Sequence, residues 1–234
     1  MRSFASDNNS GVHPLVMAAL NRANTDHALG YGDDKWTEEA VAKIKETFTQ
    51  DCVPLFVFNG TGSNVVALQL MTRPYHSIFC AETAHIYVDE CGSPVKMTGC
   101  QIRPIATPDG KLTPDLVRPY LCHFGEQHHS QPGAIYISQC SELGTVYKPD
   151  ELRALTDLAH RHGMYVHMDG ARLANACAAL NLGFRELTVD CGIDILSFGG
   201  TKNGLMLGES VVVFNPALKK EAYFVRKQSA QLAS

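Results

Sequence analysis

Short apolar runs alternate with longer helix-like segments along nearly the whole chain, and this alternation restricts the fold more than any other feature. The runs have the length of buried strands, and the segments between them have the apolar spacing of helices. Such alternation predicts an α/β fold with a mostly parallel sheet flanked by helices on both faces. The expected strands span residues 53–58, 77–80, 101–105, 134–138, 164–168, 193–198 and 208–214. The expected helices span residues 15–22, 38–49 (with Thr37 as N-cap), 65–71 and 150–162 (with Gly163 as C-cap).

The size and charge of the chain exclude several classes of protein. Its 234 residues, 45 % hydrophobic and 19 % charged, suffice for one large domain, and no repeat or linker divides residues 1–234. The net charge is −4 and lysines and arginines do not cluster, so neither nucleic acid nor a membrane surface is an expected partner. No apolar run approaches the roughly 20 residues of a membrane helix, and the N-terminus has no apolar signal core. We therefore expect a cytoplasmic protein.

The eight cysteines are scattered along the chain, and no two of them form a CxxC pair. A chain of this length without an export signal is expected to keep its thiols reduced, mostly as small buried side chains. The cysteines therefore predict no disulfide framework, no redox motif and no metal site.

Two charged residues follow two of the expected strands. Asp169 comes directly after the strand at 164–168, and Lys202 lies in a glycine-rich turn after the strand at 193–198. Because ligands of such sheets bind at the carboxyl ends of the strands, the two side chains are expected to meet there. A carboxylate that keeps a pyridine nitrogen protonated, beside an amine that bonds to an aldehyde, indicates a pyridoxal phosphate site. Taken singly, the carboxylate also fits a helix cap and the amine a surface lysine.

Four further residues fit the same site. Gly60 and Thr61 lie in a turn between an expected strand and helix, where backbone N–H groups and the helix dipole can bind phosphate; the alternative is an ordinary turn. His85 lies beyond the second expected strand, and its imidazole can stack on a ring or transfer a proton. Arg172 can pair with Asp169, with the cofactor or with a substrate carboxylate, or can form a surface ion pair.

The chain resembles the low-specificity L-threonine aldolase family of fold type I pyridoxal-phosphate enzymes. The segments that carry the resemblance are Ala5-Ser6-Asp7-Asn8, His13-Pro14, Tyr31-Gly32-Asp33-Asp34, Asn59-Gly60-Thr61-Gly62-Ser63-Asn64, Ala84-His85, His167-Met168-Asp169-Gly170-Ala171-Arg172, Gly200-Thr201-Lys202-Asn203-Gly204 and Arg226-Lys227-Gln228. The resemblance implies the large, cofactor-binding domain of that fold over residues 1–234. It also implies a smaller C-terminal domain, which we expect to be absent, because the chain stops at residue 234 within a helix-like pattern.

The resemblance implies a role for each residue at the expected strand ends. Lys202 would hold the cofactor aldehyde, and Asp169 would contact the pyridine nitrogen. His85 would stack on the ring. Gly60 and Thr61 would bind the phosphate.

Other residues would contact the substrate. Ser6 would touch the substrate carboxylate, and Arg172 would face both cofactor and substrate. His128 is the better match to the second active-site histidine of the family, with His129 as the alternative, and one of the two is expected to project into the pocket. The resemblance implies no metal.

The implied protein is a homo-oligomer, a dimer or tetramer, in which subunits share sites. Tyr31 would approach the pocket of a neighbouring subunit, and Arg226 or Lys227 would reach the neighbour's phosphate. The implied reaction cleaves the Cα–Cβ bond of L-threonine, L-allo-threonine or another β-hydroxy-α-amino acid to give glycine and an aldehyde. The proton of the β-hydroxyl would pass to His85, to His128 or to a held water.

Two alternatives to this reaction remain open. The first is another fold type I reaction, such as that of a β-eliminating lyase or an aminotransferase. The second is an inactive fragment that binds the cofactor or serves subunit assembly.

Overall fold

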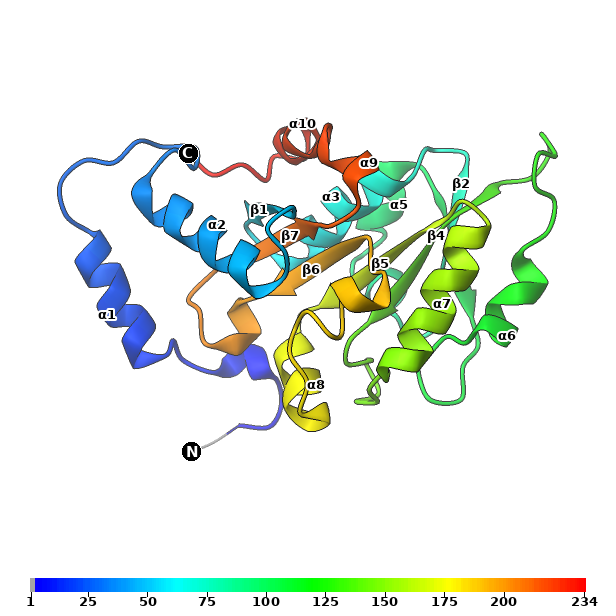
Figure 1. The fold of residues 1–234 in the computed structure, drawn as a ribbon, viewed down its shortest axis with the longest axis horizontal. Coiled ribbons are helices and arrows are strands. Elements are labelled where there is room, and N and C mark those ends of the chain that lie inside the picture. The colour runs from blue at the N-terminus through cyan, green and yellow to red at the C-terminus, as the bar shows by residue number, and fades with distance from the viewer. Residues whose placement is uncertain (1–2) are drawn as a thin grey trace.

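The computed structural model describes residues 3–234 and is built on one seven-stranded sheet (Figure 1). The strands are β1 (Val53–Val57), β2 (His76–Ala81), β3 (Gln101–Ile105), β4 (Gln131–Ser138), β5 (Tyr165–Gly170), β6 (Ile195–Gly199) and β7 (Glu209–Val213). Their order across the sheet is β1-β7-β6-β5-β4-β2-β3. β7 runs antiparallel to both its neighbours, while the other neighbouring pairs are parallel. The prediction of a mostly parallel sheet in an α/β fold is confirmed.

Helices cover both faces of the sheet and enclose two apolar cores (Figure 1). In β4, Ile135 and Ile137 pack in one core with α7 (Pro149–Arg161) and α8 (Leu173–Leu180), while Ala134 and Tyr136 pack in the other with α3 (Gly60–Met71). The alternation follows from the two-residue period of a strand. Because both faces are buried, the middle strands are apolar almost throughout, as the sequence predicted.

The remaining helices are shorter or lie at the edge of the molecule. They are α1 (Pro14–Ala23), α2 (Lys35–Thr47), α4 (His85–Val88), α5 (Ser93–Thr98), α6 (Pro114–Val117), α9 (Pro216–Lys219) and α10 (Ala222–Gln228). Four 3₁₀ helices join them: η1 (Asp7–Asn9), η2 (Arg118–Tyr120), η3 (Val189–Cys191) and η4 (Thr201–Asn203). α1 buries none of its residues and lies apart from the sheet (Figure 1).

Several helix boundaries differ from those expected, and side-chain capping explains the two largest differences. The C-cap of α7 is His162 and not Gly163. α2 begins at Lys35 because Asp34, not Thr37, is the N-cap: its Oδ1 accepts from the Thr37 N–H at 2.9 Å. α3 begins five residues early, at Gly60, because the Asn59 side chain accepts from the Gly62 N–H at 2.7 Å. The helix-like pattern at the end of the chain was misread, since α10 ends at Gln228 and residues 231–234 are irregular.

The cysteines behave as predicted where the structure describes them. None of the eight, all of which lie within residues 3–234, forms a disulfide, and five are buried. Between residues 3 and 234, no helix combines the length and apolar character needed to cross a membrane.

Gly199, the last residue of β6, has no room for a side chain. A Cβ at this position would lie 2.7 Å from the Cα of Ala171 and 2.9 Å from Oε2 of Glu209. Because the first contact is with backbone, we expect Gly199→Ala to lower the free energy of unfolding by about 1–3 kcal/mol. Urea denaturation measures this change. Gly11→Ala is the control, since its Cβ would meet nothing within 4 Å; equal losses in the two variants would contradict the packing argument.

Candidate functional site

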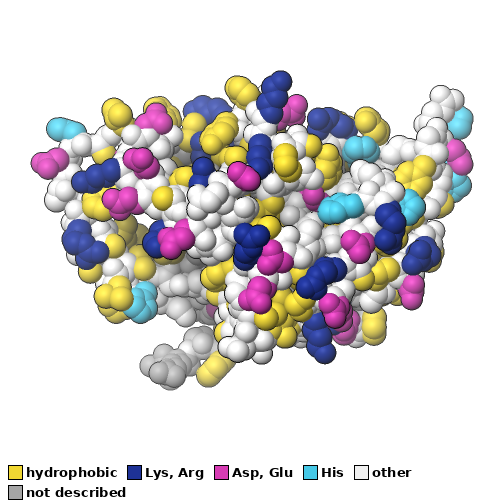
Figure 2. Space-filling view, in the orientation of Figure 1, with side chains coloured by type: hydrophobic (Ala, Val, Ile, Leu, Met, Phe, Trp, Pro, Cys, Tyr) yellow, Lys and Arg dark blue, Asp and Glu magenta, His cyan; other side chains and the backbone are white. Residues whose placement is uncertain are grey.

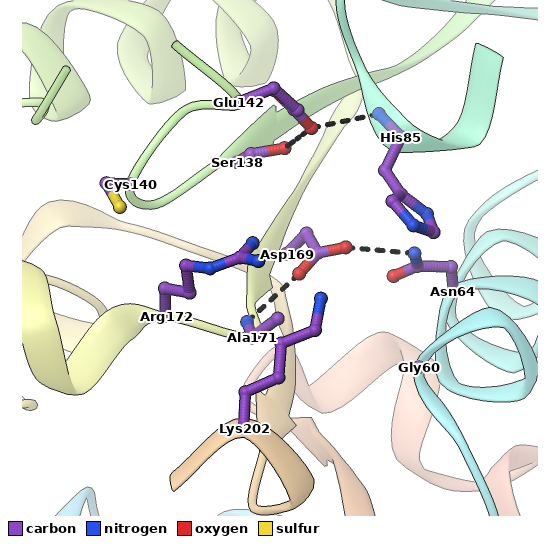
Figure 3. A pocket seen from close by; sticks show the side chains of 10 residues that line it. All are labelled: Gly60, Asn64, His85, Ser138, Cys140, Glu142, Asp169, Ala171, Arg172 and Lys202. Atoms are coloured by element: carbon purple, nitrogen blue, oxygen red, sulfur yellow. Dashed lines mark hydrogen bonds between the residues drawn. The ribbon is translucent and has the colours of Figure 1, made fainter. Parts of the chain in front are cut away.

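A pocket lies at the carboxyl ends of β4, β5 and β6 (Figure 3). It is lined by five of the residues selected from the sequence: Gly60, His85, Asp169, Arg172 and Lys202. Asp169 lies near the end of β5, and the other four lie in four different connections of the sheet, so the arrangement of the strands brings them together.

Asp169, the fifth residue of β5, is a half-buried carboxylate with three hydrogen-bond donors around it. Its Oδ1 accepts from the Ala171 N–H at 3.0 Å, and its Oδ2 accepts from the Asn64 amide at 3.0 Å and from the Tyr136 hydroxyl at 2.8 Å. Burial by itself would raise the pKa of Asp169, but these hydrogen bonds outweigh it and the net pKa is lowered. The carboxyl group is therefore ionised at neutral pH.

Asn64, in the second turn of α3, links two acidic residues of the site. Its Nδ2 donates to Asp169 and also, at 2.7 Å, to Oε1 of Glu90, while its Oδ1 accepts from the Ser197 hydroxyl at 2.9 Å. All of its amide atoms are thus engaged, and the residue is buried. The side chain fixes Asp169 relative to the side of the pocket formed by His85 and Glu90.

His85, the first residue of α4, is oriented by Glu90. The Nδ1 of the imidazole lies 2.8 Å from Oε1 of Glu90, whose side chain is fully buried. The hydrogen bond to Glu90 raises the pKa of His85, against the opposite effect of burial. The imidazole is thus held in one orientation, with its Nδ1 turned away from the pocket.

We expect Glu90→Gln to lower the pKa of His85, because the amide cannot stabilise the imidazolium as the carboxylate does. NMR titration of the histidine ring signals measures the shift. His160, which pairs with Asp194 at 3.0 Å elsewhere, is the internal control and should titrate unchanged.

Glu90→Gln should also lower the free energy of unfolding by an amount that depends on pH. The folded-state pKa of His85 is raised, so its contribution is complete below the unfolded value of about 6.5 and is lost as pH rises through the folded value. Glu90→Gln should therefore destabilise more in mild acid than in mild base, and a pH-independent loss would contradict the pairing.

Arg172, the N-cap of α8, is held by an acidic residue from the N-terminal segment. Its Nε and an Nη donate to the two carboxylate oxygens of Asp7 at 2.6 and 3.0 Å. Burial would raise the pKa of Asp7, but the hydrogen bonds and charge of Arg172 outweigh it, and the pKa is lowered. Ser6 caps η1 beside this pair, its hydroxyl accepting from the Asn8 N–H at 3.2 Å.

Lys202 lies in η4, on the turn between β6 and β7, and its amine points into the pocket (Figure 3). The next residue ties this turn to the sheet: the Asn203 amide donates to the carbonyls of Gly199 at 2.8 Å and Ala171 at 3.1 Å. The lysine therefore projects from a turn whose position is set by β5 and β6.

The N-terminus of α3 opens toward the pocket at Gly60. A Cβ built on this residue would meet nothing within 4 Å, so no packing contact requires a glycine there. Thr61 follows it in the first turn and is half-buried. The first N–H groups of a helix have no partner within the helix, so this end of α3 is suited to bind an anion.

Neither His128 nor His129 lines this pocket, so the expectation that one of them projects into it is wrong for the pocket of the same chain. Both precede β4 and therefore lie at its amino end, whereas the pocket lies at its carboxyl end. β4 has eight residues, which separate its two ends by roughly 23 Å at about 3.3 Å per residue. His129 instead pairs with Glu126, 3.6 Å away.

Tyr31, Arg226 and Lys227 lie together, and none of the three lines the pocket. Tyr31 and Arg226 line the same hollow near the last residues of the chain, and the Lys227 amine lies 5.1 Å from the centre of the Tyr31 ring. Tyr31 is exposed, as a residue that meets a neighbouring subunit would be. Its predicted role, and those of the two basic residues, stay predictions.

Five residues line the pocket without having been given a role from the sequence. Asn64 and Ala171 lie in segments that carry the resemblance, whereas Ser138, Cys140 and Glu142 were missed. Glu142 is the one acidic residue among these five. Its Oε1 accepts from the Ser138 hydroxyl at 2.7 Å and from the backbone N–H of His85 at 2.9 Å (Figure 3). The sequence could have indicated Glu142, because it lies just after β4. Asp169 and Lys202 lie in the same way at the carboxyl ends of β5 and β6.

Comparison with known proteins gives consistent matches over the chain. The family model described as "Beta-eliminating lyase" matches residues 3–233. The low specificity L-threonine aldolases of Pseudomonas sp. (strain NCIMB 10558) and of Pseudomonas aeruginosa are each 43 % identical to this chain over 234 residues, which is 100 % of the chain and 68 % of each relative. Among solved structures, the Leishmania major threonine aldolase superposes with a TM-score of 0.93 at 31 % identity, covering 100 % of this chain and 68 % of the other.

Proposed function

This chain belongs to the beta-eliminating lyase family, together with the low-specificity L-threonine aldolases, and we propose that it cleaves L-threonine and L-allo-threonine to glycine and acetaldehyde. The observation that carries the proposal is the pocket that holds the ionised carboxylate of Asp169, the amine of Lys202 and the imidazole of His85. Related β-hydroxy-α-amino acids would be cleaved by the same route, since only the aldehyde part differs.

The pocket residues fit pyridoxal phosphate as the cofactor. Lys202 would hold its aldehyde, Asp169 its ring nitrogen, and Gly60 with Thr61 its phosphate. Three observations support the fit: the carboxylate is kept ionised by its donors, the amine reaches the pocket, and Gly60 leaves the helix end open. When bound, the cofactor supplies an aldehyde that combines with amines and a ring that accepts the electrons of a broken bond.

Side chains of the pocket would bind and orient the cofactor and the substrate. Asp169 would stabilise positive charge on the ring nitrogen of the bound cofactor, because its carboxylate is fixed by three donors. Arg172 recognises the substrate carboxylate as a planar partner, as it already pairs with Asp7, and Ser6 lies next to this contact. Lys202 would hold the cofactor through its aldehyde, and its amine would be the group that the substrate amine replaces.

Glu142 is the group that we assign to the β-hydroxyl proton. The Nδ1 of His85 is already bonded to Glu90, and the imidazole would stack on the cofactor ring, so we assign His85 a positioning role and not the proton transfer. One oxygen of Glu142 is fixed by the Ser138 hydroxyl and by the backbone N–H of His85, which leaves the other oxygen for the substrate. Loss of the hydroxyl proton lets the Cα–Cβ bond break and acetaldehyde leave; a proton returned to Cα completes glycine.

We expect Glu142→Gln to lower kcat about 10²-fold or more with little change in KM, since the amide keeps the shape and the hydrogen bonds to Ser138 and His85 but cannot take a proton. Steady-state kinetics with L-threonine measures both constants. Ser138→Ala is the comparison: it removes a bond to the carboxylate without removing the acceptor, and should cost less. An unchanged kcat in Glu142→Gln would contradict this assignment and would indicate that His85 or a held water takes the proton.

Product analysis tests the reaction itself. Cleavage of L-threonine gives glycine and acetaldehyde in equal amounts. β-Elimination would give a 2-oxo acid and ammonia, and transamination would give a 2-oxo acid without release of ammonia. Either of those outcomes would overturn the proposal, and a chain that binds the cofactor without forming glycine would indicate an inactive binding fragment.

We also propose that the enzyme works as a homo-oligomer. Tyr31 and Lys227 are exposed, none of Tyr31, Arg226 and Lys227 lines the pocket, and α1 presents Leu15 and Leu20 to solvent. Residues of this kind are suited to meet a second copy of the chain. Sedimentation equilibrium gives the number of subunits.

A further inference from the structure

Three side chains that commonly bind metals converge in the loop between η2 and β4. His123, Glu126 and His129 each offer one ligand atom, and these atoms all lie within 4.8 Å of one another. The Nδ1 of His123 lies 3.0 Å from Oε2 of Glu126, and the Nε2 of His129 lies 3.6 Å from the same oxygen. Histidine and acidic side chains are seen at the projecting tip at the right of Figure 2, where this loop leaves the sheet.

Two of the three separations are close to those between ligands of a tetrahedral ion. Zinc binds nitrogen and oxygen ligands at about 2.0–2.2 Å, which places two ligands of a tetrahedron about 3.4 Å apart. The two measured separations, 3.0 and 3.6 Å, lie on either side of this value. The rings of His123 and His129 face each other with centroids 4.1 Å apart and planes 17° apart, so both present an edge to the same side as the carboxylate.

A single amide holds the backbone of all three residues. The Nε2 of Gln131, the first residue of β4, donates to the carbonyls of His123 at 3.2 Å, Glu126 at 3.1 Å and His129 at 2.9 Å. Its Oε1 accepts from the Gly125 N–H at 2.7 Å, inside the same loop. The loop is therefore fixed in the conformation that gathers the three side chains, at the point where it joins a rigid strand.

We propose that His123, Glu126 and His129 form a binding site for a divalent transition-metal ion of the zinc class. Two imidazoles and one carboxylate suit zinc, cobalt or nickel, whereas calcium and magnesium prefer oxygen ligands throughout. All three side chains are exposed, so solvent can reach the ion and supply the fourth ligand. The site lies at the amino end of β4, opposite the pocket, and its ion would brace the loop without taking part in the reaction.

Cobalt titration of the untagged, chelator-treated chain tests the site, with Co²⁺ as a visible-absorbance probe and Zn²⁺ as competitor. We expect one equivalent of Co²⁺ to bind, with the absorption of nitrogen and oxygen ligands and no thiolate charge-transfer band, and Zn²⁺ to displace it. His123→Ala and His129→Ala should each weaken binding at least about tenfold. His128→Ala and Cys122→Ser, in the same loop but outside the cluster, are matched controls and should bind as the parent does.

Gln131→Ala separates a built site from chance binding at a histidine-rich surface. It removes no ligand atom, but it frees the backbone of all three residues, so affinity should fall about tenfold. Gln131→Glu is the second variant, since it keeps the acceptor for Gly125 and places a charge against the three carbonyls. The proposal is overturned if no saturable binding occurs, if a thiolate band accompanies it, or if the control variants weaken it as much as the cluster variants do.

Discussion

Replacing Lys202 with alanine is expected to abolish glycine formation from L-threonine, with a loss of roughly 10⁴-fold or more. The amine is the group of the pocket that can bond covalently to the cofactor aldehyde, and alanine offers nothing in its place. The substitution removes a side chain that points into a cavity, so the packing of β6 and β7 and the free energy of unfolding should change little. Coupled assay of acetaldehyde, with urea denaturation alongside, measures both effects.

Borohydride trapping gives the Lys202 experiment an outcome independent of turnover. Reduction of the parent chain with bound pyridoxal phosphate should attach the cofactor covalently to the peptide that contains Lys202, and Lys202→Ala should retain none. Lys96→Ala, at an exposed lysine of α5, is the control and should label as the parent does. Covalent label on another lysine of the parent chain, or undiminished glycine formation by Lys202→Ala, would contradict the assignment.

Asp169→Asn is expected to lower kcat by roughly 10²- to 10³-fold while the chain still folds. The amide has nearly the shape of the carboxylate and keeps an acceptor for the Ala171 N–H, but it carries no charge to oppose a protonated ring nitrogen. Its N–H₂ group must face the Asn64 amide or the Tyr136 hydroxyl, so a cost of about 1–3 kcal/mol in unfolding free energy accompanies the change.

The pH dependence of stability distinguishes the charge of Asp169 from its shape. Its folded-state pKa is lowered, so the parent chain gains stability above the unfolded value of about 3.9 and loses it as pH falls through the folded value. In Asp169→Asn this contribution is missing, so the difference between parent and variant should shrink in strong acid. A difference that stays constant from neutral to acid pH would show that the carboxylate contributes through packing alone.

The residues that the sequence revealed are those next to a strand end. Asp169 and Lys202 could be placed because a parallel sheet gathers its carboxyl ends at one edge, whatever the loops do. His128 was misplaced because a resemblance in spacing was preferred to this rule, which assigns residues before β4 to the opposite edge. Glu142 obeys the rule and was overlooked.

Asn64 shows what local sequence does not contain. Its three side-chain partners, Glu90, Asp169 and Ser197, lie 26, 105 and 133 residues away along the chain. No periodicity or motif records such contacts, because they arise only when α3 packs against β5 and β6. The seven strands and four of the ten α-helices that the structure describes (α1, α2, α3 and α7) could be predicted from apolar spacing, whereas the hydrogen-bond network that fixes the pocket could not.

The turn that carries Lys202 differs from the other connections around the pocket. β6 and β7 are antiparallel neighbours and are joined directly through η4, whereas β4 to β5 and β5 to β6 are joined through the crossover helices α7 and α8. An insertion in a crossover connection changes how its helix packs on the core. An insertion in a direct turn lowers stability by little more than the added loop entropy. Libraries with insertions at residues 205–207, beyond Asn203, are therefore a practical route to reshaping the rim beside the amine while the sheet keeps its register.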